Sequence, residues 1–361
     1  MINERTGFVL LACVCLALLG CKGNTAGSKG ESAGGQDSVA LNGAGATFPY
    51  PLYSKWMAEY NRLHPNVKIN YQSIGSGGGI RQIVAGTVDF GATDTAMKDD
   101  EAKGAPGKIL HVPATIGAVV IAYNVPDVGG GLKLTSESIS GIYLGDIKKW
   151  NDPKITEANP GVALPDKDIA VVYRTDGSGT TGVFTDYLGK VSPAWKEKVG
   201  VGKSVKWPIG LGAKGNEGVT GQVKTTPGSI GYIESAYATQ NKLAVAIVKN
   251  RSGQFVEPKP EASTEAAQGV ELGDDLHASI TDAEGAAAYP IAAYTYILVY
   301  EDTKNARKGE ALAKFLWWAI HDGQKYAAQL HYAPLPEKVV TKTEERLKSL
   351  RSGDKKLLGG V

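Results

Sequence analysis

Apolar residues follow two alternating patterns along this chain, and each pattern predicts one kind of element. Continuous apolar runs predict buried strands, and they occupy residues 39–41, 67–71, 115–123, 169–173, 230–233, 243–248 and 294–300. Apolar residues spaced three and four apart predict buried helix faces, and they occur within residues 52–63, 80–84, 181–188 and 312–319. Because strands alternate with helices, we predict an α/β fold with largely parallel sheets.

The first 20 residues depart from this pattern and have the features of a targeting segment. Arg5 precedes an apolar run from Phe8 to Gly20, about 13 residues long against the roughly 20 that a membrane-spanning helix needs. The run ends in Leu18-Leu19-Gly20-Cys21, which resembles the lipobox of bacterial lipoproteins, so we expect Cys21 to carry a lipid. The alternative is an ordinary secretory signal that ends in cysteine. We assign residues 1–20 to a signal peptide and residues 21–38, rich in Gly, Ser and Lys, to a flexible tether.

Cysteine content, net charge and length limit the classes of function and architecture that are possible. Cys13 and Cys15 would leave with the signal peptide, so the mature chain would keep only Cys21, which excludes disulfides and thiol catalysis. The formal net charge of +2 does not favour nucleic acid as a partner. A chain of 361 residues is long enough to form two lobes.

Three loops rich in glycine and hydroxyl groups each connect a predicted strand to a predicted helix. They contain Thr47 and Phe48, residues Gly75–Gly79, and residues Asp176–Thr180. A helix N-terminus directs unpaired N–H groups and the positive end of its dipole at an anion, and strand ends in open α/β sheets gather such loops. Arg174 adds a two-pronged cationic donor, and Ser178 and Thr180 add hydroxyls. Singly each loop is an ordinary turn, but together they predict an oxyanion site.

Asp94 is the unexpected residue in this set, because a carboxylate repels a fully ionised anion. It could instead cap a helix or form a salt bridge. If it faces the anion it can only accept a hydrogen bond, so the ligand must supply the proton. Phosphate keeps a proton near neutral pH and sulfate does not, so a carboxylate here would select phosphate. Asp176, two residues after Arg174, is placed to orient the guanidinium.

Patterns that would indicate catalysis, a metal or a nucleotide are not supported. Gly202-Lys203-Ser204 lacks the earlier glycine of a phosphate-binding P-loop, and Pro208 interrupts the strand that should precede the dinucleotide-like run Gly210–Gly215. No nucleophile elbow surrounds Ser76 or Ser178, and the five histidines have no metal-ligand spacing. We therefore expect a binding protein with no cofactor and no metal.

Five motifs, in their order along the chain, resemble the phosphate-binding protein of the bacterial ABC phosphate importer, the PstS family. They are Gly43–Pro49, Gly75–Gly79, Asp89–Asp94, Arg174–Thr180 and Lys206–Gly212, and the likeness runs from about Leu41 to Pro336. The resemblance implies a two-lobed periplasmic-binding-protein fold of type II, a Venus flytrap with a hinge. Lobe 1 would comprise residues 39–114 with 292–361, and lobe 2 residues 115–291. Residues 251–288 match only loosely and are assigned no role.

The resemblance also implies the site residues and the function. The phosphate contacts would be Thr47, the Phe48 backbone N–H, Ser76, Asp94, Arg174, Ser178, the Gly179 backbone N–H and Thr180, with Asp176 holding Arg174. The protein would be a lipid-anchored, extracytoplasmic (periplasmic) receptor that passes phosphate to the ABC permease membrane subunits and their ATPase. The alternatives are a receptor for sulfate, molybdate or another oxyanion on the same fold, an anchored phosphatase or serine hydrolase, and an adhesion or signalling lipoprotein with a vestigial site.

Overall fold

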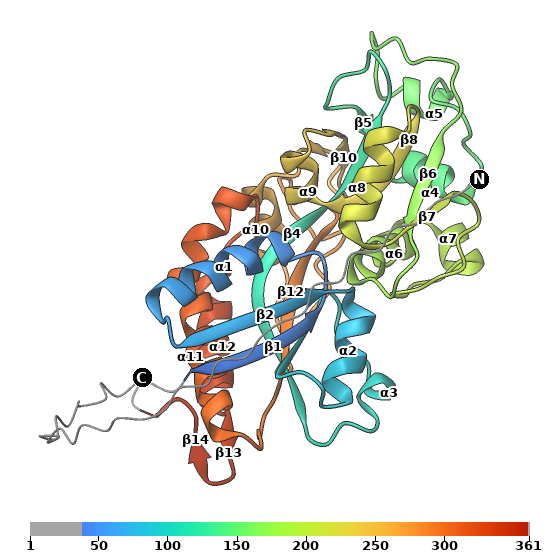
Figure 1. Ribbon diagram of the computed structural model, residues 1–361. Coiled ribbons are helices and arrows are strands. Elements are labelled where there is room, and N and C mark those ends of the chain that lie inside the picture. Colours follow the sequence, from blue (N-terminus) through green and yellow to red (C-terminus); the bar gives the residue numbers. More distant parts are fainter. Residues whose placement is uncertain (1–37, 360–361) are drawn as a thin grey trace, which may run out of the picture. The chain divides into compact units, whose positions relative to one another are not determined.

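A nine-stranded sheet organises the part of the chain that the computed structural model describes, residues 38–359 (Figure 1). The predicted signal peptide, Cys21 and nearly all of the predicted tether lie outside these residues. The strands are β1 (Val39–Gly45), β2 (Val67–Ser73), β3 (Phe90–Thr93), β4 (Ile109–Asn124), β5 (Lys133–Leu134), β6 (Ala170–Arg174), β7 (Leu211–Ala213), β8 (Ser229–Glu234), β9 (Ala244–Val245), β10 (Ile247–Lys249), β11 (Phe255–Val256), β12 (Ala292–Tyr300), β13 (Arg351–Ser352) and β14 (Lys355–Lys356).

The helices lie between and after these strands. They are α1 (Tyr50–Leu63), α2 (Ser76–Val84), α3 (Asp99–Ala102), α4 (Ser136–Leu144), α5 (Pro153–Thr156), α6 (Gly179–Val191), α7 (Pro193–Lys198), α8 (Gly215–Thr225), α9 (Ser235–Gln240), α10 (Pro260–Gln268), α11 (Ala306–Ile320) and α12 (Glu337–Lys348), with 3₁₀ turns at Asp322–Tyr326 and Ala328–Leu330. The predicted buried face of α11 is confirmed by Leu312, Phe315, Leu316 and Ala319. In α1 the prediction holds for Leu52, Tyr53, Trp56 and Tyr60, whereas Met57 is only half-buried and Leu63, the last residue of the helix, is 48 % exposed.

The long strand β4 joins two halves of the sheet. Its residues 109–118 pair with β12, which continues to β3, β1 and β2, and we call this the first half. Residues 119–124 pair with β8, which continues to β6 and β7, and this is the second half. All of β4 except its two end residues is buried. The lobe boundaries at 114/115 and 291/292 remain a prediction.

The sheet is mixed, so the prediction of largely parallel sheets was wrong in this respect. β1 is parallel to β2 and β3, and β6 is parallel to β7 and β8, as strand–helix–strand units require. β4 and β12, however, run antiparallel to each other and to the strands beside them. A continuous apolar run is also what a parallel buried strand shows, so these sequences do not reveal the direction.

The segment 251–288, expected to be loop and exposed helix, contains a helix that is partly buried. α10 packs on β4 and β12, and its Ala266 and Ala267 are buried because small side chains allow a close approach. Farther along, the ring of His277 packs edge-on against that of His111 from β4. Leu276 and Asp282 take left-handed backbone conformations, with φ of 58° and 52°, which marks two sharp turns in the segment.

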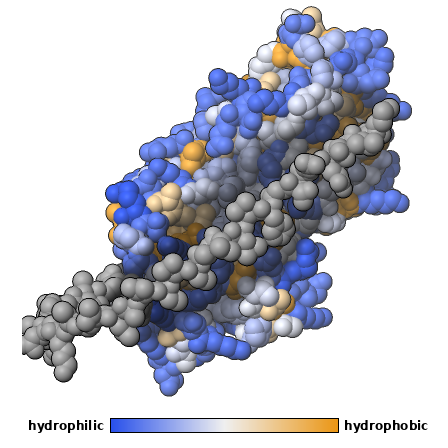
Figure 2. All heavy atoms as spheres, viewed as in Figure 1, coloured by the Kyte–Doolittle hydropathy of each residue, from blue (hydrophilic) through white to orange (hydrophobic). Residues whose placement is uncertain are grey.

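The face of the molecule seen in Figure 2 is largely hydrophilic, with its hydrophobic residues in small separate groups. Such scattered apolar groups are ordinary for a protein surface. Within residues 38–359 the longest helices fall short of the length and hydropathy that a membrane crossing requires.

Candidate functional site

The three predicted loops meet where the two halves of the sheet face each other. Thr47 follows β1, Ser76 begins α2 and Asp94 follows β3 in the first half. In the second half Arg174 ends β6, Ser178 caps α6, and Gly179 and Thr180 are the first residues of that helix. All eight residues predicted to contact the anion are buried, and the seven other than Gly179 are 3 % exposed or less. The two glycine loops touch directly, because the Gly77 N–H donates to the Gly177 carbonyl at 2.8 Å.

Glycine is required at two points of this junction. Gly75 has φ of 88°, a left-handed conformation that turns the chain into α2. A Cβ added at Gly179 would collide with Asp94 Oδ2 and Ser76 Oγ. The absence of a side chain therefore lets the N-terminus of α6 approach the first half of the sheet.

Arg174 and Asp176 form a buried, two-pronged ion pair. Arg174 Nε donates to Asp176 Oδ1 at 2.8 Å and its Nη2 to Oδ2 at 2.6 Å. Burial opposes ionisation of Asp176, but the guanidinium outweighs it and holds the pKa of this carboxyl below its ordinary value. Asp176 Oδ1 also accepts from the Gly215 N–H at 3.0 Å. The remaining nitrogen of the guanidinium, Arg174 Nη1, donates to Thr180 Oγ1 at 3.3 Å.

Asp94 is buried beside this pair but does not join it. Thr295 Oγ1 donates to its Oδ1 at 2.9 Å, and Ser76 Oγ to its Oδ2 at 3.4 Å. Burial raises its pKa to about 7, although the hydrogen bonds of Thr295 and Ser76 and the charge of Arg174 pull the other way. Over the described residues Asp94 caps no helix and forms no ion pair, so neither of its alternative roles is found.

Ser76, Ser178 and Gly179 connect the N-terminus of α6 to the first half. Ser178 is the N-cap of α6, and its Oγ accepts from the Thr181 N–H at 3.0 Å. Ser76 Oγ accepts from the Gly179 N–H at 3.0 Å, across the two halves. Two of the predicted contact groups thus bond to each other in this structure.

Sequence reasoning missed two residues of this cluster, Asn216 and Thr295. Asn216, the second residue of α8, is fully buried and donates to both Thr47 Oγ1 and Thr180 Oγ1. Its signal is a fourth glycine-rich turn into a helix, the run Gly210–Gly215, which overlaps the last of the five family motifs but was assigned no ligand contact. Thr295 is the one hydroxyl-bearing aliphatic residue in the apolar run of β12, and that polar break was its signal.

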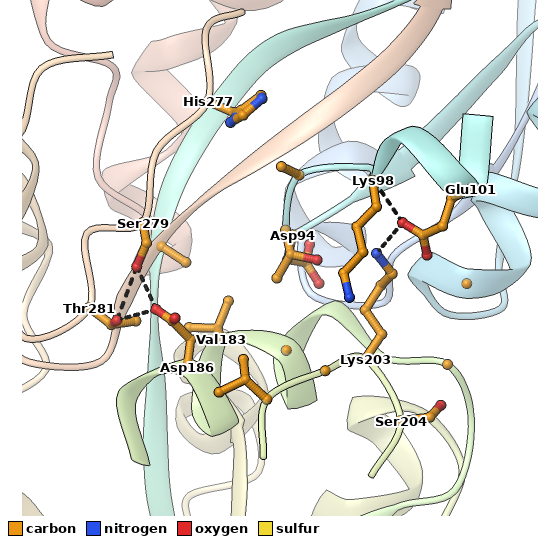
Figure 3. Close-up of a pocket in the computed structure, with 18 of the residues that line it drawn as sticks. Asp94, Lys98, Glu101, Val183, Asp186, Lys203, Ser204, His277, Ser279 and Thr281 are labelled. Carbon is orange, nitrogen blue, oxygen red and sulfur yellow. Dashed lines mark hydrogen bonds and ion pairs between the residues drawn. The ribbon is translucent and has the colours of Figure 1, made fainter. Parts of the chain in front are cut away.

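A cavity of about 740 Å³ lies next to the cluster, and Asp94 forms part of its wall (Figure 3). The other seven predicted contact residues do not line it, because they pack against one another. Lys203 Nζ from the second half forms an ion pair with Glu101 Oε2 of α3 at 2.8 Å, and both residues line this cavity. Across the described chain, His, Cys, Asp and Glu side chains form no group of three that could hold a metal ion.

Comparisons with known proteins agree with the sequence resemblance. The family model described as a PBP superfamily domain matches residues 28–322. The chain is 46 % identical over 353 residues to phosphate-binding protein PstS of Xylella fastidiosa, covering 94 % of this chain and 96 % of that protein. It is 47 % identical over 322 residues to PstS of Pasteurella multocida, covering 88 % and 93 %.

Solved structures show the same fold at low sequence identity. A phosphate-binding protein from Stenotrophomonas maltophilia superposes with a TM-score of 0.67 at 20 % identity, over 85 % of this chain and 94 % of that one. A high-affinity periplasmic phosphate-binding protein solved with bound phosphate superposes with a TM-score of 0.69 at 21 % identity, over 85 % and 93 %. At this identity the likeness establishes the two-lobed α/β architecture.

Proposed function

Because this chain belongs to the PstS family of phosphate-binding proteins, we propose that it binds inorganic phosphate between the two halves of its sheet and delivers it to an ABC phosphate importer. The observation that carries the proposal is the buried cluster in which Arg174, four hydroxyl side chains and a helix N-terminus converge from both halves. The family is one of binding proteins, and the chain is not an enzyme.

The donors of the cluster suit a tetrahedral oxyanion. Buried polar groups are costly unless they are paired, so a cluster of donors around one point favours an anionic partner. Arg174 supplies charge, Thr47 and Ser178 supply hydroxyls, and the Phe48 N–H meets no acceptor within residues 38–359. A phosphate would replace Ser76 as the acceptor from the Gly179 N–H and would be held from both halves, which stabilises the closed arrangement.

Asp94 would select the ligand. It can accept a hydrogen bond from the proton that phosphate carries near neutral pH, whereas an ionised Asp94 has nothing to accept from sulfate. The unfavourable approach of two unprotonated anions would then exclude sulfate and molybdate.

The chain would work outside the cytoplasmic membrane. A signal peptide would direct it there, and a lipid on Cys21 would anchor it through the tether. The permease with its ATPase would be its partner. Labelling with a radioactive fatty acid, lost in Cys21→Ala, would test the anchor.

Titration calorimetry with phosphate, sulfate and molybdate tests the proposed specificity. We expect tight, one-to-one binding of phosphate and no measurable sulfate binding at pH 8. Asp94→Asn should gain sulfate affinity, because an amide can also donate. Tight sulfate binding with none for phosphate in the wild type would refute the proposal, and unchanged selectivity in Asp94→Asn would show that Asp94 is not the proton acceptor.

A further inference from the structure

The side-chain amide of Asn216 donates hydrogen bonds to the two threonines of the cluster, and the orientation of this amide is fixed. Its Oδ1 accepts from the Glu234 backbone N–H at 2.9 Å, and a backbone N–H can only donate, so the orientation of the amide is determined. Its Nδ2 therefore faces the threonines, at 2.8 Å from Thr47 Oγ1 and 3.2 Å from Thr180 Oγ1. Thr47 belongs to the first half of the sheet and Thr180 to the second, so one amide bridges both.

The number of hydrogen bonds that each threonine hydroxyl already accepts then decides whether it can only donate to a ligand. A hydroxyl has one donor hydrogen and two acceptor lone pairs. Thr47 Oγ1 accepts from Asn216 Nδ2 and, at 3.2 Å, from the Asn216 N–H. Thr180 Oγ1 accepts from Asn216 Nδ2 and from Arg174 Nη1. Both acceptor capacities are filled by obligate donors, so each threonine has only its proton left to offer.

From this we infer that Asn216 is a positioning residue that makes Thr47 and Thr180 hydrogen-bond donors to the bound phosphate. The inference rests on the proposed function. It differs from the role of the other hydroxyls: Ser76 donates to Asp94, and Ser178 caps α6. In the arrangement of the halves seen here, Asn216 limits how the Thr47 hydroxyl can rotate, so its proton does not have to reorient toward the anion. Preorganised donors of this kind bind an anion more tightly than donors that must first reorient.

Two substitutions at Asn216 change the hydrogen bonds of the threonine hydroxyls in different ways. Asn216→Ala removes one donor from each hydroxyl, because Thr47 keeps only the backbone N–H of residue 216 and Thr180 keeps only Arg174 Nη1. One lone pair of each hydroxyl is then unfilled, so the hydroxyl is no longer restricted to donating. We expect phosphate affinity to fall at least tenfold, on the scale of a hydrogen bond to a charged group. Asn216→Asp keeps the shape but replaces Nδ2 by an oxygen that accepts the threonine protons and repels the anion. Its affinity loss should be larger, on the order of a hundredfold or more.

A double-mutant cycle separates positioning from a merely structural role. With Thr47→Val and Thr180→Val already present there is no hydroxyl to orient, so adding Asn216→Ala should change the phosphate dissociation constant by less than about twofold. The same tenfold loss in that background would overturn the inference, as would an Asn216→Ala or Asn216→Asp protein that binds like the wild type.

Asn124→Asp is the matched control, because Asn124 Nδ2 donates to the Val223 and Lys224 carbonyls at the other end of α8. It tests whether disturbing α8 alone weakens binding, and we expect wild-type affinity. Equal losses in Asn124→Asp and Asn216→Asp would refute the positioning role. Thermal unfolding without phosphate confirms that each variant is folded. Failure of the wild type itself to bind phosphate would instead refute the proposed function.

Discussion

At the scale of single residues, we expect Asp94 to couple the choice of ligand to pH. Its pKa of about 7 is raised by burial, so the side chain is ionised above pH 7 and protonated below it. A protonated Asp94 can donate to sulfate, whereas an ionised one repels it. The preference for phosphate over sulfate should therefore be greatest at pH 8 and fall by up to about tenfold per pH unit below 7. Calorimetric titrations between pH 5.5 and 8 measure this ratio.

The control for this prediction is Asp94→Asn, which has no titratable group at the position. Its phosphate-to-sulfate ratio should vary little over the same range. A wild-type ratio that stays constant with pH, or one that rises as the pH falls, would contradict the role given to Asp94.

At the scale of elements, the loop at residues 201–204 links the N-terminus of α6 to α3 in the other half of the sheet. The Lys203 carbonyl accepts from the Ser178 N–H at 2.9 Å, and Lys203 Nζ pairs with Glu101 Oε2 from the other half of the sheet. The lysine and glutamate side chains are 12 % and 26 % exposed, so solvent partly screens their attraction. The ion pair therefore contributes only modestly to the free energy that keeps the two halves closed.

Glu101→Gln should speed phosphate release roughly two- to fivefold, which corresponds to the loss of about 0.5–1 kcal/mol from a screened ion pair. Stopped-flow measurement of release shows the effect, and high salt should reduce the difference from the wild type. Glu59→Gln is the control, because the ion pairs of Glu59 with Lys55 and Arg62 both lie inside α1 and, among residues 38–359, link it to no other element. Equal release rates in the wild type and Glu101→Gln would show that the pair does not hold the halves together.

At the scale of the whole molecule, the two halves share one sheet through β4, and the proposed ligand contacts both. Binding should therefore stabilise them together. Phosphate at about 1,000 times its dissociation constant should raise the free energy of unfolding by about 4 kcal/mol. Scanning calorimetry should show one transition that moves upward with phosphate concentration. Arg174→Ala should abolish the shift, and two transitions of which only one moves would contradict this view.

Much of the fold and of the cluster could be predicted from local sequence. The buried faces of α1 and α11 follow from apolar spacing, because a helix repeats every 3.6 residues whatever surrounds it. Thr47, Ser76 and residues 174–180 lie where a strand passes into a helix, and the N-terminus of a helix leaves N–H groups unpaired by itself. Asn216 was missed because its importance lies in which hydroxyls it meets, and those are 169 and 36 residues away along the chain.

The sequence by itself determined the main buried strands, the most regular helices and the types of polar group at their ends, because these depend on neighbours a few residues apart. The tertiary structure alone decided the antiparallel direction of β4 and β12 and the burial of α10, since these depend on packing between distant segments. It also decided that burial raises the pKa of Asp94 and that the acceptors of Thr47 and Thr180 are filled. The desolvation of a carboxyl group and the number of hydrogen bonds that a hydroxyl accepts are set only when groups distant in the sequence are brought together.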